Sequence, residues 1–462
     1  MNISRACLAA LLSVFIACSR GRPAGTSPEG GTPIIFDGGV SDGGVPDGGQ
    51  DVPRTRVCPA TPPLDGGLAW DAGVRATRVP PQAIGWTAVS SDPSCQSVLT
   101  PAAPSAQLTW LGPTDGVCDA PSINGDGDLA IFSLTGKSFG FNFATADGRS
   151  GAFAASSKTE QLTVAAPLPH GFATVVHEFT TACDYSRVVD STEHVSGPTL
   201  IDGPYARQIF DVITNPHGGF VEVRTFTGGS SVTNPNYLEL RWVDDSLQPA
   251  GDWHTAVTWP VGSENSWTVV VDETGRALVL SFMFPPSLGS PPDPSTWVFS
   301  ARWMDVGGSA SDAFTPTTPI YTAANGRAYF ANWDVIMPLR EGGIVMYHPP
   351  LQGPGTLSPA GWYAYYPSGQ ATVAAPPAWL DSYDGSLQLV AHGTAYAAVQ
   401  RDALTCARKV SLISPSGVTC YQLPVSGSDL CGTKDTLQSD GTLIIRSVCA
   451  LRWWPQLARL VQ

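Results

Sequence analysis

Residues 266–282, with the sequence SWTVVVDETGRALVLSF, carry the pattern that decides the fold. Residues 266–272 and 276–282 are two short runs rich in Val, Leu and aromatic residues, which is the composition of β-strands. The turn residues Glu273, Thr274 and Gly275 separate them. The stretch therefore predicts two antiparallel strands joined by a tight turn.

The chain after this hairpin completes a four-stranded unit. A proline-rich loop leads into a third strand, expected over 297–304, and a Gly-Gly turn at 307–308 precedes a fourth run near 313–318. A glycine before one strand of each unit recurs along the chain, at Gly171, Gly219, Gly275, Gly343, Gly393 and Gly441. The spacings are 48, 56, 68, 50 and 48 residues, with a mean of 54. Self-similarity at a fixed period is typical of repeat architectures.

Four antiparallel strands in each repeated unit of this length resemble the blades of a β-propeller. We therefore expect an all-β fold, a β-propeller of about seven blades (six to eight), with tandem β-sandwiches as the alternative. Only eight residues follow Trp454, so the last unit lacks its fourth strand. Residues of about 66–80 are predicted to supply that strand, because an open sheet edge is a liability.

Tryptophans divide into two groups. Trp242, Trp303 and Trp453 occupy one repeated position, after Arg, which predicts packing between blades. Trp253, His254 and Trp259 fall on an expected outer strand. Because aromatic faces stack on sugar rings, these three are the candidates for an exposed ligand site, with carbohydrate or protein as the ligand.

The composition limits the fold and the partners. The 462 residues include 48 Gly and 41 Pro, and only 14% are charged. Gly and Pro at this density interrupt long helices, which excludes a helical bundle or coiled coil. The net charge of −14 argues against nucleic-acid binding.

The N-terminus resembles that of a bacterial lipoprotein. Arg5 precedes an uncharged run over residues 6–17, which is too short to span a bilayer. Phe15-Ile16-Ala17-Cys18 is similar to a lipobox, with Phe15 where such motifs usually carry Leu. The resemblance implies cleavage of a signal peptide, residues 1–17, and lipid attachment at Cys18. Two or three acyl chains would hold the protein firmly on a membrane.

Residues 18–57 are expected to be a disordered linker. They contain three copies of Asp-Gly-Gly at a five-residue period, starting at Asp37, and too few apolar residues to form a core. Such tethers recur in lipoproteins of myxobacteria and their relatives. The organisation predicted is thus a signal peptide, a lipid-anchored linker and a propeller-like domain over 58–462. The expected location is the cell envelope, with the protein anchored in the outer membrane and facing the periplasm or the cell surface.

The ten cysteines of the sequence are consistent with an exported protein. Cys7 leaves with the signal peptide and Cys18 takes the lipid, which leaves eight in a compartment that permits disulfides. Equivalent repeat positions predict the pairs Cys95–Cys118 and Cys406–Cys420. Cys431–Cys449 is expected between neighbouring strands, and Cys58–Cys183 remains by elimination.

One motif invites a metal interpretation. Asn124, Asp126 and Asp128 alternate with glycines, and the segment resembles the calcium loops of integrin-like propeller repeats. It is two residues shorter than that pattern and occurs once, so a hairpin turn is the preferred interpretation. No cofactor is expected, with calcium as the alternative.

Motifs for catalysis are missing from the sequence. There is no G-x-S-x-G elbow, P-loop, dinucleotide fingerprint or HExxH, so no catalytic residue is assigned. The preferred hypothesis is a non-catalytic binding or scaffold lipoprotein. The alternatives are a polysaccharide-acting hydrolase or lyase with a central-channel site, and a surface adhesion protein.

Overall fold

The computed structural model of the chain describes the residues between 67 and 461 in segments. These are residues 67–70, 76–79, 85–98, 100–101, 107–111, 122–124, 126–135, 138–147, 149–154, 160–168, 170–178, 183–189, 199–202, 208–226, 236–246, 248–260, 264–284, 298–316, 321–322, 328–329, 335–348, 361–383, 388–392, 395–402, 404–405, 407–425, 434–437, 441–446, 450–455, 457–458 and 460–461. Within these segments no helix is long and apolar enough to cross a bilayer.

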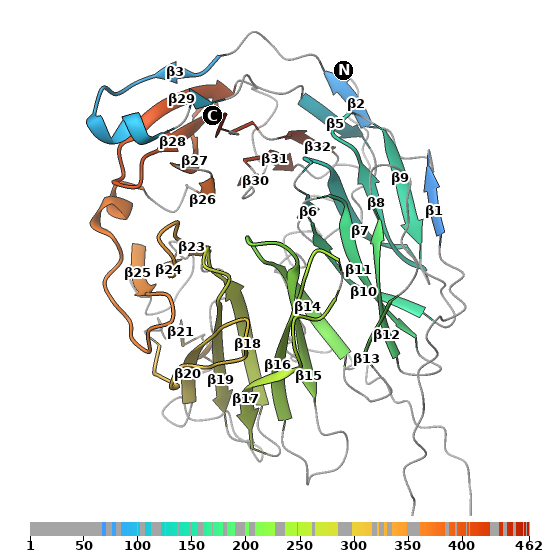
Figure 1. Ribbon diagram of the computed structural model, residues 1–462. Coiled ribbons are helices and arrows are strands. Elements are labelled where there is room, and N and C mark those ends of the chain that lie inside the picture. Colours follow the sequence, from blue (N-terminus) through green and yellow to red (C-terminus); the bar gives the residue numbers. More distant parts are fainter. Residues whose placement is uncertain are drawn as a thin grey trace, which may run out of the picture.

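Seven sheets of three to five strands form a ring in the described part of the chain, with the first strand of each sheet toward the centre (Figure 1). Along the chain, each first strand contacts the first strand of the next sheet. In each sheet the strands from residue 122 onward form an antiparallel meander, because they pair in chain order. This is a β-propeller, and the predicted fold class and number of blades are confirmed. We number the sheets as blades 1 to 7.

The strands of each blade follow one another in sequence. Blades 1 and 2 consist of β6 (Ser122–Ile123), β7 (Leu129–Thr135), β8 (Ser138–Ala144) and β9 (Ser150–Ala154), then β10 (Glu160–Pro167), β11 (Phe172–Glu178), β12 (Cys183–Val189) and β13 (Thr199–Asp202). Blades 3 and 4 consist of β14 (Gln208–Thr214), β15 (Phe220–Phe226), β16 (Asn236–Val243) and β17 (His254–Trp259), then β18 (Glu264–Val271), β19 (Ala277–Phe284) and β20 (Val298–Met304). Blade 5 is β23 (Val335–Pro338), β24 (Ile344–His348) and β25 (Gly361–Tyr366). Blade 6 is β26 (Gln388–His392), β27 (Ala395–Arg401), β28 (Arg408–Ile413) and β29 (Thr419–Val425), and blade 7 opens with β30 (Lys434–Leu437), β31 (Leu443–Arg446) and β32 (Ala450–Trp454).

Blades 4 and 5 have an irregular outer edge. In blade 4 the predicted fourth run is reduced to isolated bridges, which pair Ala301 with Phe314 and Met304 with Ala310. In blade 5 a bridge between Tyr365 and Ala374 takes the same place. A two-stranded ribbon, β21 (Tyr321–Thr322) and β22 (Ala328–Tyr329), lies in the sequence between them.

The repeated glycines lie in the turns between the first and second strands, as the period predicts. Gly219 shows why glycine is required. Its φ is +69°, and an added Cβ would lie 1.9 Å from the carbonyl oxygen of Val243. Such a backbone is open to glycine and strained for other residues. Gly393 lies outside the described residues.

The hydrophobic core lies between blades rather than around the axis. Val221 and Leu240 of blade 3 cluster with Val269 and Val279 of blade 4, and similar clusters join blades 2 to 3, 4 to 5, 5 to 6 and 6 to 7. The repeated tryptophans Trp242, Trp303 and Trp453 lie on third strands and are at most 2% exposed, which confirms their packing role.

The N-terminal segment closes the ring, although not with the residues predicted. The fourth strand of blade 7 is β5 (Gln107–Leu111), which pairs with β32. The strand β2 (Ala76–Val79), inside the predicted range 66–80, adds a fifth strand outside β5. The sequence reasoning thus found the source of the strand, but the residues it chose form the fifth strand of the sheet, and the fourth strand comes about 30 residues later in the chain.

The same segment runs along the outside of three blades, and we call its described part the strap, which comprises residues 67–70, 76–79, 85–98, 100–101 and 107–111. The strand β1 (Gly67–Trp70) pairs with β9 of blade 1, and β3 (Thr87–Ala88) pairs with β29 of blade 6. The strand β4 (Thr100–Pro101) pairs with the C-terminal β33 (Leu460–Val461). Antiparallel pairing therefore fastens the strap to blades 1, 6 and 7 (Figure 1).

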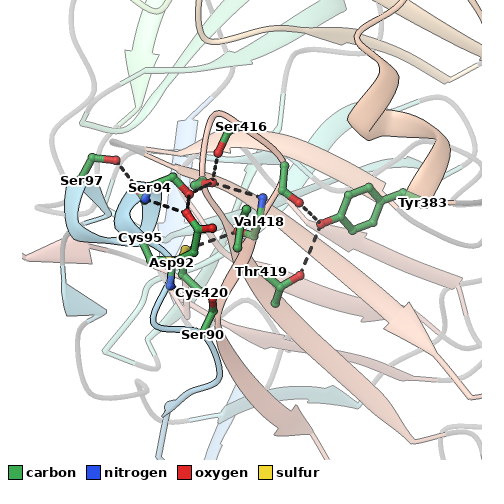
Figure 2. The surroundings of a disulfide bond; sticks show 12 residues. Ser90, Asp92, Ser94, Cys95, Ser97, Tyr383, Ser416, Val418, Thr419 and Cys420 are labelled. Carbon is green, nitrogen blue, oxygen red and sulfur yellow. Dashed lines mark hydrogen bonds between the residues drawn. A yellow bond between two sulfur atoms is a disulfide. The ribbon is translucent and has the colours of Figure 1, made fainter.

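A disulfide fixes the strap to blade 6. Cys95, in the 3-10 turn η2 (Pro93–Ser97), bonds to Cys420 of β29, 325 residues away (Figure 2). Ser94 Oγ lies 3.1 Å from Ser414 Oγ in the turn before β29, and the backbone N–H of Val89 donates to the carbonyl of Cys420. The cross-link therefore joins two distant parts of the chain.

This bond corrects two predicted pairs. Cys95 is not bonded to Cys118, nor Cys406 to Cys420, because the equivalence of repeat positions on which those pairs relied does not hold for the strap. The structure does not describe the sulfur atoms of the pairs Cys431–Cys449 and Cys58–Cys183, so these two pairs stay predictions.

Candidate functional site

The turns after the first strands gather at one end of the axis, because those strands surround it (Figure 1). We call them the axial turns. In blades 1 to 5 they comprise residues 124 and 126–128, 168 and 170–171, 215–219, 272–276, and 339–343. Each is closed by backbone hydrogen bonds, for example from Gly275 N–H to the carbonyl of Asp272. Short closed turns hold their side chains in fixed places.

Asp272 fastens the axial turn of blade 4 to that of blade 5. Its carboxylate is fully buried. Oδ1 accepts hydrogen bonds from the Thr274 N–H (2.9 Å), the Thr274 hydroxyl (2.7 Å) and the Arg276 N–H (3.2 Å). Oδ2 accepts from the N–H of Gly343 in the next blade, at 2.8 Å. Asp272 is therefore a support for the turns and is not free to bind a ligand.

Tyr396 makes the next connection, from blade 6 to blade 5. Its hydroxyl donates to Glu341 Oε2 at 2.6 Å and accepts from the N–H of Arg340 at 2.9 Å. Burial and the hydrogen bond to Glu341 raise the pKa of Tyr396 well above its usual range. The phenol therefore stays protonated and donates to Glu341 at all ordinary pH values.

Glu273 lies among charges from three blades. Burial raises the pKa of its carboxyl, and the charge of nearby Asp272 adds to this effect. Arg340 of blade 5 and His217 of blade 3 act in the opposite direction, so both lie close enough to interact with it. His217, Arg340 and Glu341 are exposed, while Glu273 is half-buried.

These four side chains, His217, Glu273, Arg340 and Glu341, form what we call the axial cluster. It combines a guanidinium, an imidazole and two carboxyl groups from three blades. The supports behind it, Asp272 and Tyr396, are buried and hydrogen-bonded. Together these groups can donate hydrogen bonds to a polar or zwitterionic ligand and accept hydrogen bonds from it.

The predicted metal candidates form a self-contained turn. Asn124 Oδ1 accepts from the N–H groups of Asp126 and Asp128, and Asn124 Nδ2 donates to Asp128 Oδ2. Asp128 Oδ1 accepts from Ala146 N–H, and burial raises the pKa of Asp128. Asp126 lies 3.0 Å from Nδ1 of His170, on the axial turn of blade 2. These oxygens are thus engaged by the protein itself, as the hairpin interpretation expects. No group of three or more His, Cys, Asp or Glu side chains in the described segments is arranged to hold a metal ion.

The aromatic candidates lie on or beside the outer strand of blade 3, as predicted, but they form no exposed platform. Two guanidinium groups cover the ring of half-buried Trp253, that of Arg224 at 3.8 Å and that of Arg241 at 4.4 Å from the centroid. His254 lies against Gly308 of blade 4. Trp259 is only 3% exposed and packs in the core between blades 3 and 4, where it also lines a cavity.

The remaining predicted site residues are the cysteine of the lipobox and the cysteines of the predicted disulfides. Cys18 lies outside the described residues, and the bonded Cys95 and Cys420 are structural. His170 and His217 lie in equivalent axial turns, those of blades 2 and 3. Sequence reasoning did not select Glu273, Arg340 and Glu341, although aligning the turns Asn-Pro-His-Gly-Gly, Asp-Glu-Thr-Gly-Arg and Leu-Arg-Glu-Gly-Gly would have placed all three beside His217.

Comparisons with known proteins find distant likenesses of shape. No protein-family model and no curated protein matches the chain. A puromycin hydrolase is similar at 14% identity over 79% of this chain, with a TM-score of 0.26, and the chain spans only 61% of that protein. TolB from Acinetobacter baumannii is similar at 13% identity over 71% of this chain and 78% of its own, with a TM-score of 0.29. An oligogalacturonate lyase in complex with manganese is similar at 10% identity over 82% of this chain and 98% of its own, with a TM-score of 0.36. Similarity at this level says nothing about activity.

Proposed function

We propose that the protein is a membrane-tethered cell-envelope lipoprotein whose β-propeller is a non-catalytic binding domain, with the axial cluster as its binding surface. The observation that carries the proposal is the support behind the cluster. Asp272 and Tyr396 each join two blades through hydrogen bonds to backbone N–H groups. They thereby hold in place the turns of blades 4 and 5, which carry Glu273, Arg340 and Glu341, and preorganisation of this kind favours binding.

The tether follows from the N-terminal sequence. Cys18 after an apolar run supports lipid attachment, and the Asp-Gly-Gly repeat supports a flexible spacer. Residues 19–57 have a reach of about 30–40 Å as a Gly-rich coil. The binding domain would thus stand clear of the membrane surface.

Site-specific photo-crosslinking in the native host tests the binding surface. Benzoylphenylalanine replaces Arg340 in the axial cluster or, as the control, Leu404 in the loop between β27 and β28, which is 95% exposed. The proposal expects a discrete envelope adduct from position 340 and none from 404. Equal labelling from both positions, or none from 340, would contradict it.

Intact-mass measurement tests the anchor separately. The mature chain is expected to begin at Cys18 with the added mass of its acyl chains, and a Cys18→Ala variant is expected in the soluble fraction. An unlipidated mature chain in the membrane fraction would rule out the anchor without affecting the axial cluster.

A polysaccharide-acting hydrolase or lyase is the second candidate, favoured by Glu273. A carboxyl group with a raised pKa beside a histidine and an arginine is a common arrangement in acid–base catalysis. Purified protein incubated with acidic polysaccharides would then release reducing ends or unsaturated products, and Glu273→Gln would abolish this release. If no product forms with the wild-type chain, this candidate fails and the binding proposal stands.

A further inference from the structure

A cavity lies between blades 3 and 4, away from the axial cluster. Its volume is about 390 Å³, at the lower end of the range for small-molecule pockets. The outer strand β17 forms one wall, and strands β19 and β20 form the other. Its walls include the side chains of Trp259, Ser281, Met283, Val298, Ser300 and Arg302.

Arg302 is the charged group of this cavity. Its Nη1 donates to the carbonyl oxygen of Ala256 at 3.3 Å, at the point where the register of β17 shifts against β16. Its Nε is buried and has no hydrogen-bond partner among the described residues. A buried charged donor without a partner is costly, so the position calls for an acceptor.

The hydrogen bond to Ala256 occupies Nη1, and because its acceptor is a neutral carbonyl it leaves the positive charge of the guanidinium unbalanced. A carboxylate in the cavity would balance that charge and accept a charge-assisted hydrogen bond from Nη2. None of the described residues that line the cavity is acidic. The hydroxyls of Ser281 and Ser300 are further donors on the same wall.

Apart from Thr258, the rest of the lining is apolar. Trp259, Met283 and Val298 offer an indole, a thioether and a branched side chain. A ligand that fits this lining has an apolar body and one anionic group, since a second charge would be placed against apolar atoms.

We propose that the cavity between blades 3 and 4 binds a small carboxylate with an apolar body, through Arg302. This site goes beyond the proposed function, because it is separate from the axial cluster and needs neither the tether nor a macromolecular partner. The same chemistry can come from a free aryl or alkyl carboxylate or from the C-terminal residue of a peptide.

Calorimetric titration of the purified mature chain with four probes tests the site. The probes are 3-phenylpropanoate, its neutral isostere 3-phenylpropanamide, N-acetylphenylalanine and N-acetylphenylalanine amide. The proposal expects saturable binding of at least one carboxylate, with the matching amide weaker by about tenfold, as expected for the loss of charge-assisted hydrogen bonds. Binding of 3-phenylpropanoate alone indicates a free carboxylate, whereas binding of N-acetylphenylalanine indicates a peptide terminus.

Variants assign the binding to this cavity. Arg302→Gln keeps a donor for the Ala256 carbonyl and is expected to weaken carboxylate binding about tenfold. Ser300→Leu narrows the cavity without removing Arg302 and is expected to weaken carboxylate and amide alike. Arg276→Gln, an exposed arginine in the axial turn of the same blade, is the matched control and is expected to bind as the wild type.

Three results would overturn the proposal. They are the absence of saturable binding of every carboxylate probe to the wild type, equal affinity for acid and amide, and unchanged carboxylate affinity in either Arg302→Gln or Ser300→Leu. Circular dichroism and thermal unfolding of each variant show that it is folded before its affinity is compared.

Discussion

The strap and the axial turns hold the same ring together by opposite means. The strap joins blades 6, 7 and 1 through strands from the far end of the chain and through Cys95–Cys420, which spans 325 residues. The axial turns join blades 4, 5 and 6 through hydrogen bonds of Asp272 and Tyr396, between groups that are 55 to 71 residues apart in sequence. The strap closes the ring by contacts between distant parts of the chain, whereas the axial turns connect neighbouring blades of the repeat.

This difference separates what keeps the ring closed from what shapes its binding surface. Loss of the closure opens a sheet edge on blade 7, because β5 is the only strand that the described residues place between β32 and β2. Loss of an axial hydrogen bond leaves the blades intact and releases a turn. The two regions therefore give separate predictions, which follow in order of expected size.

Removal of β5 is expected to have the largest effect. A chain that begins at residue 112 lacks the fourth strand of blade 7 and exposes the edge of β32. We expect it to aggregate or unfold, as judged by size-exclusion chromatography and circular dichroism. A chain that begins at residue 85 loses β1 and β2 but keeps β5 and the disulfide, and it is the matched control, expected to fold as a monomer. Equal behaviour of the two chains would show that β5 does not close the ring.

Removal of the disulfide comes next. Replacing both Cys95 and Cys420 by Ser is expected to lower the free energy of unfolding by about 2–5 kcal/mol, because a very long loop is then no longer constrained in the unfolded chain. Denaturant unfolding measures the change, and peptide mapping without reductant verifies the wild-type bond. Recovery of a Cys95–Cys118 peptide would contradict the structure.

Removal of an axial support is expected to lower the free energy of unfolding less than removal of the disulfide does. Asp272→Ala leaves the buried N–H of Gly343 and two groups of Thr274 without their acceptor, and should cost about 1–3 kcal/mol in unfolding experiments. Asp305→Ala removes a turn carboxylate that accepts from Ser309 N–H near the surface, and serves as the comparison, with an expected cost within about 0.5 kcal/mol. A similar cost at both positions would mean that Asp272 does not join the blades.

The smallest expected effect is a dependence of the folding stability on pH, through Glu273. Because burial raises the pKa of Glu273, its protonated form is favoured in the folded state. Its contribution to stability is therefore present in acid and is lost as the pH rises through the folded-state pKa. The stability of Glu273→Gln relative to the wild type should increase between about pH 4, near the ordinary pKa of Glu, and about pH 7. A relative stability that is constant over this interval would show that Glu273 is not buried against the axial turns.

The sequence predicts the blades well because they are local. Gly219, Gly275 and Gly343 mark turns whose strands pair with their immediate neighbours, and the repeated Trp242 and Trp303 mark packing between blades. The closure is different, since its partners come from opposite ends of the chain. No period relates Cys95 to Cys420, so a rule based on repeats pairs each with the wrong cysteine.

The candidate site was found only in part for a related reason. A histidine recurs in two of the axial turns, at His170 and His217, whereas Glu273 and Arg340 each occur in one turn alone. Their significance comes from the ring, which brings successive turns side by side. The cavity at Arg302 likewise depends on the packing of two neighbouring blades, although Trp259 in its lining was among the predicted residues.

Hydrogen exchange on the variant with Cys95 and Cys420 both replaced by Ser tests most directly whether the binding surface is independent of the closure. Peptides that cover residues 85–98 should lose protection relative to the wild type, because η2 is no longer bonded to β29. Peptides that cover residues 272–276 and 339–343 should keep theirs, because their amides are held by bonds within and between blades 4 and 5. Joint loss of protection in the strap and the axial turns would contradict the account.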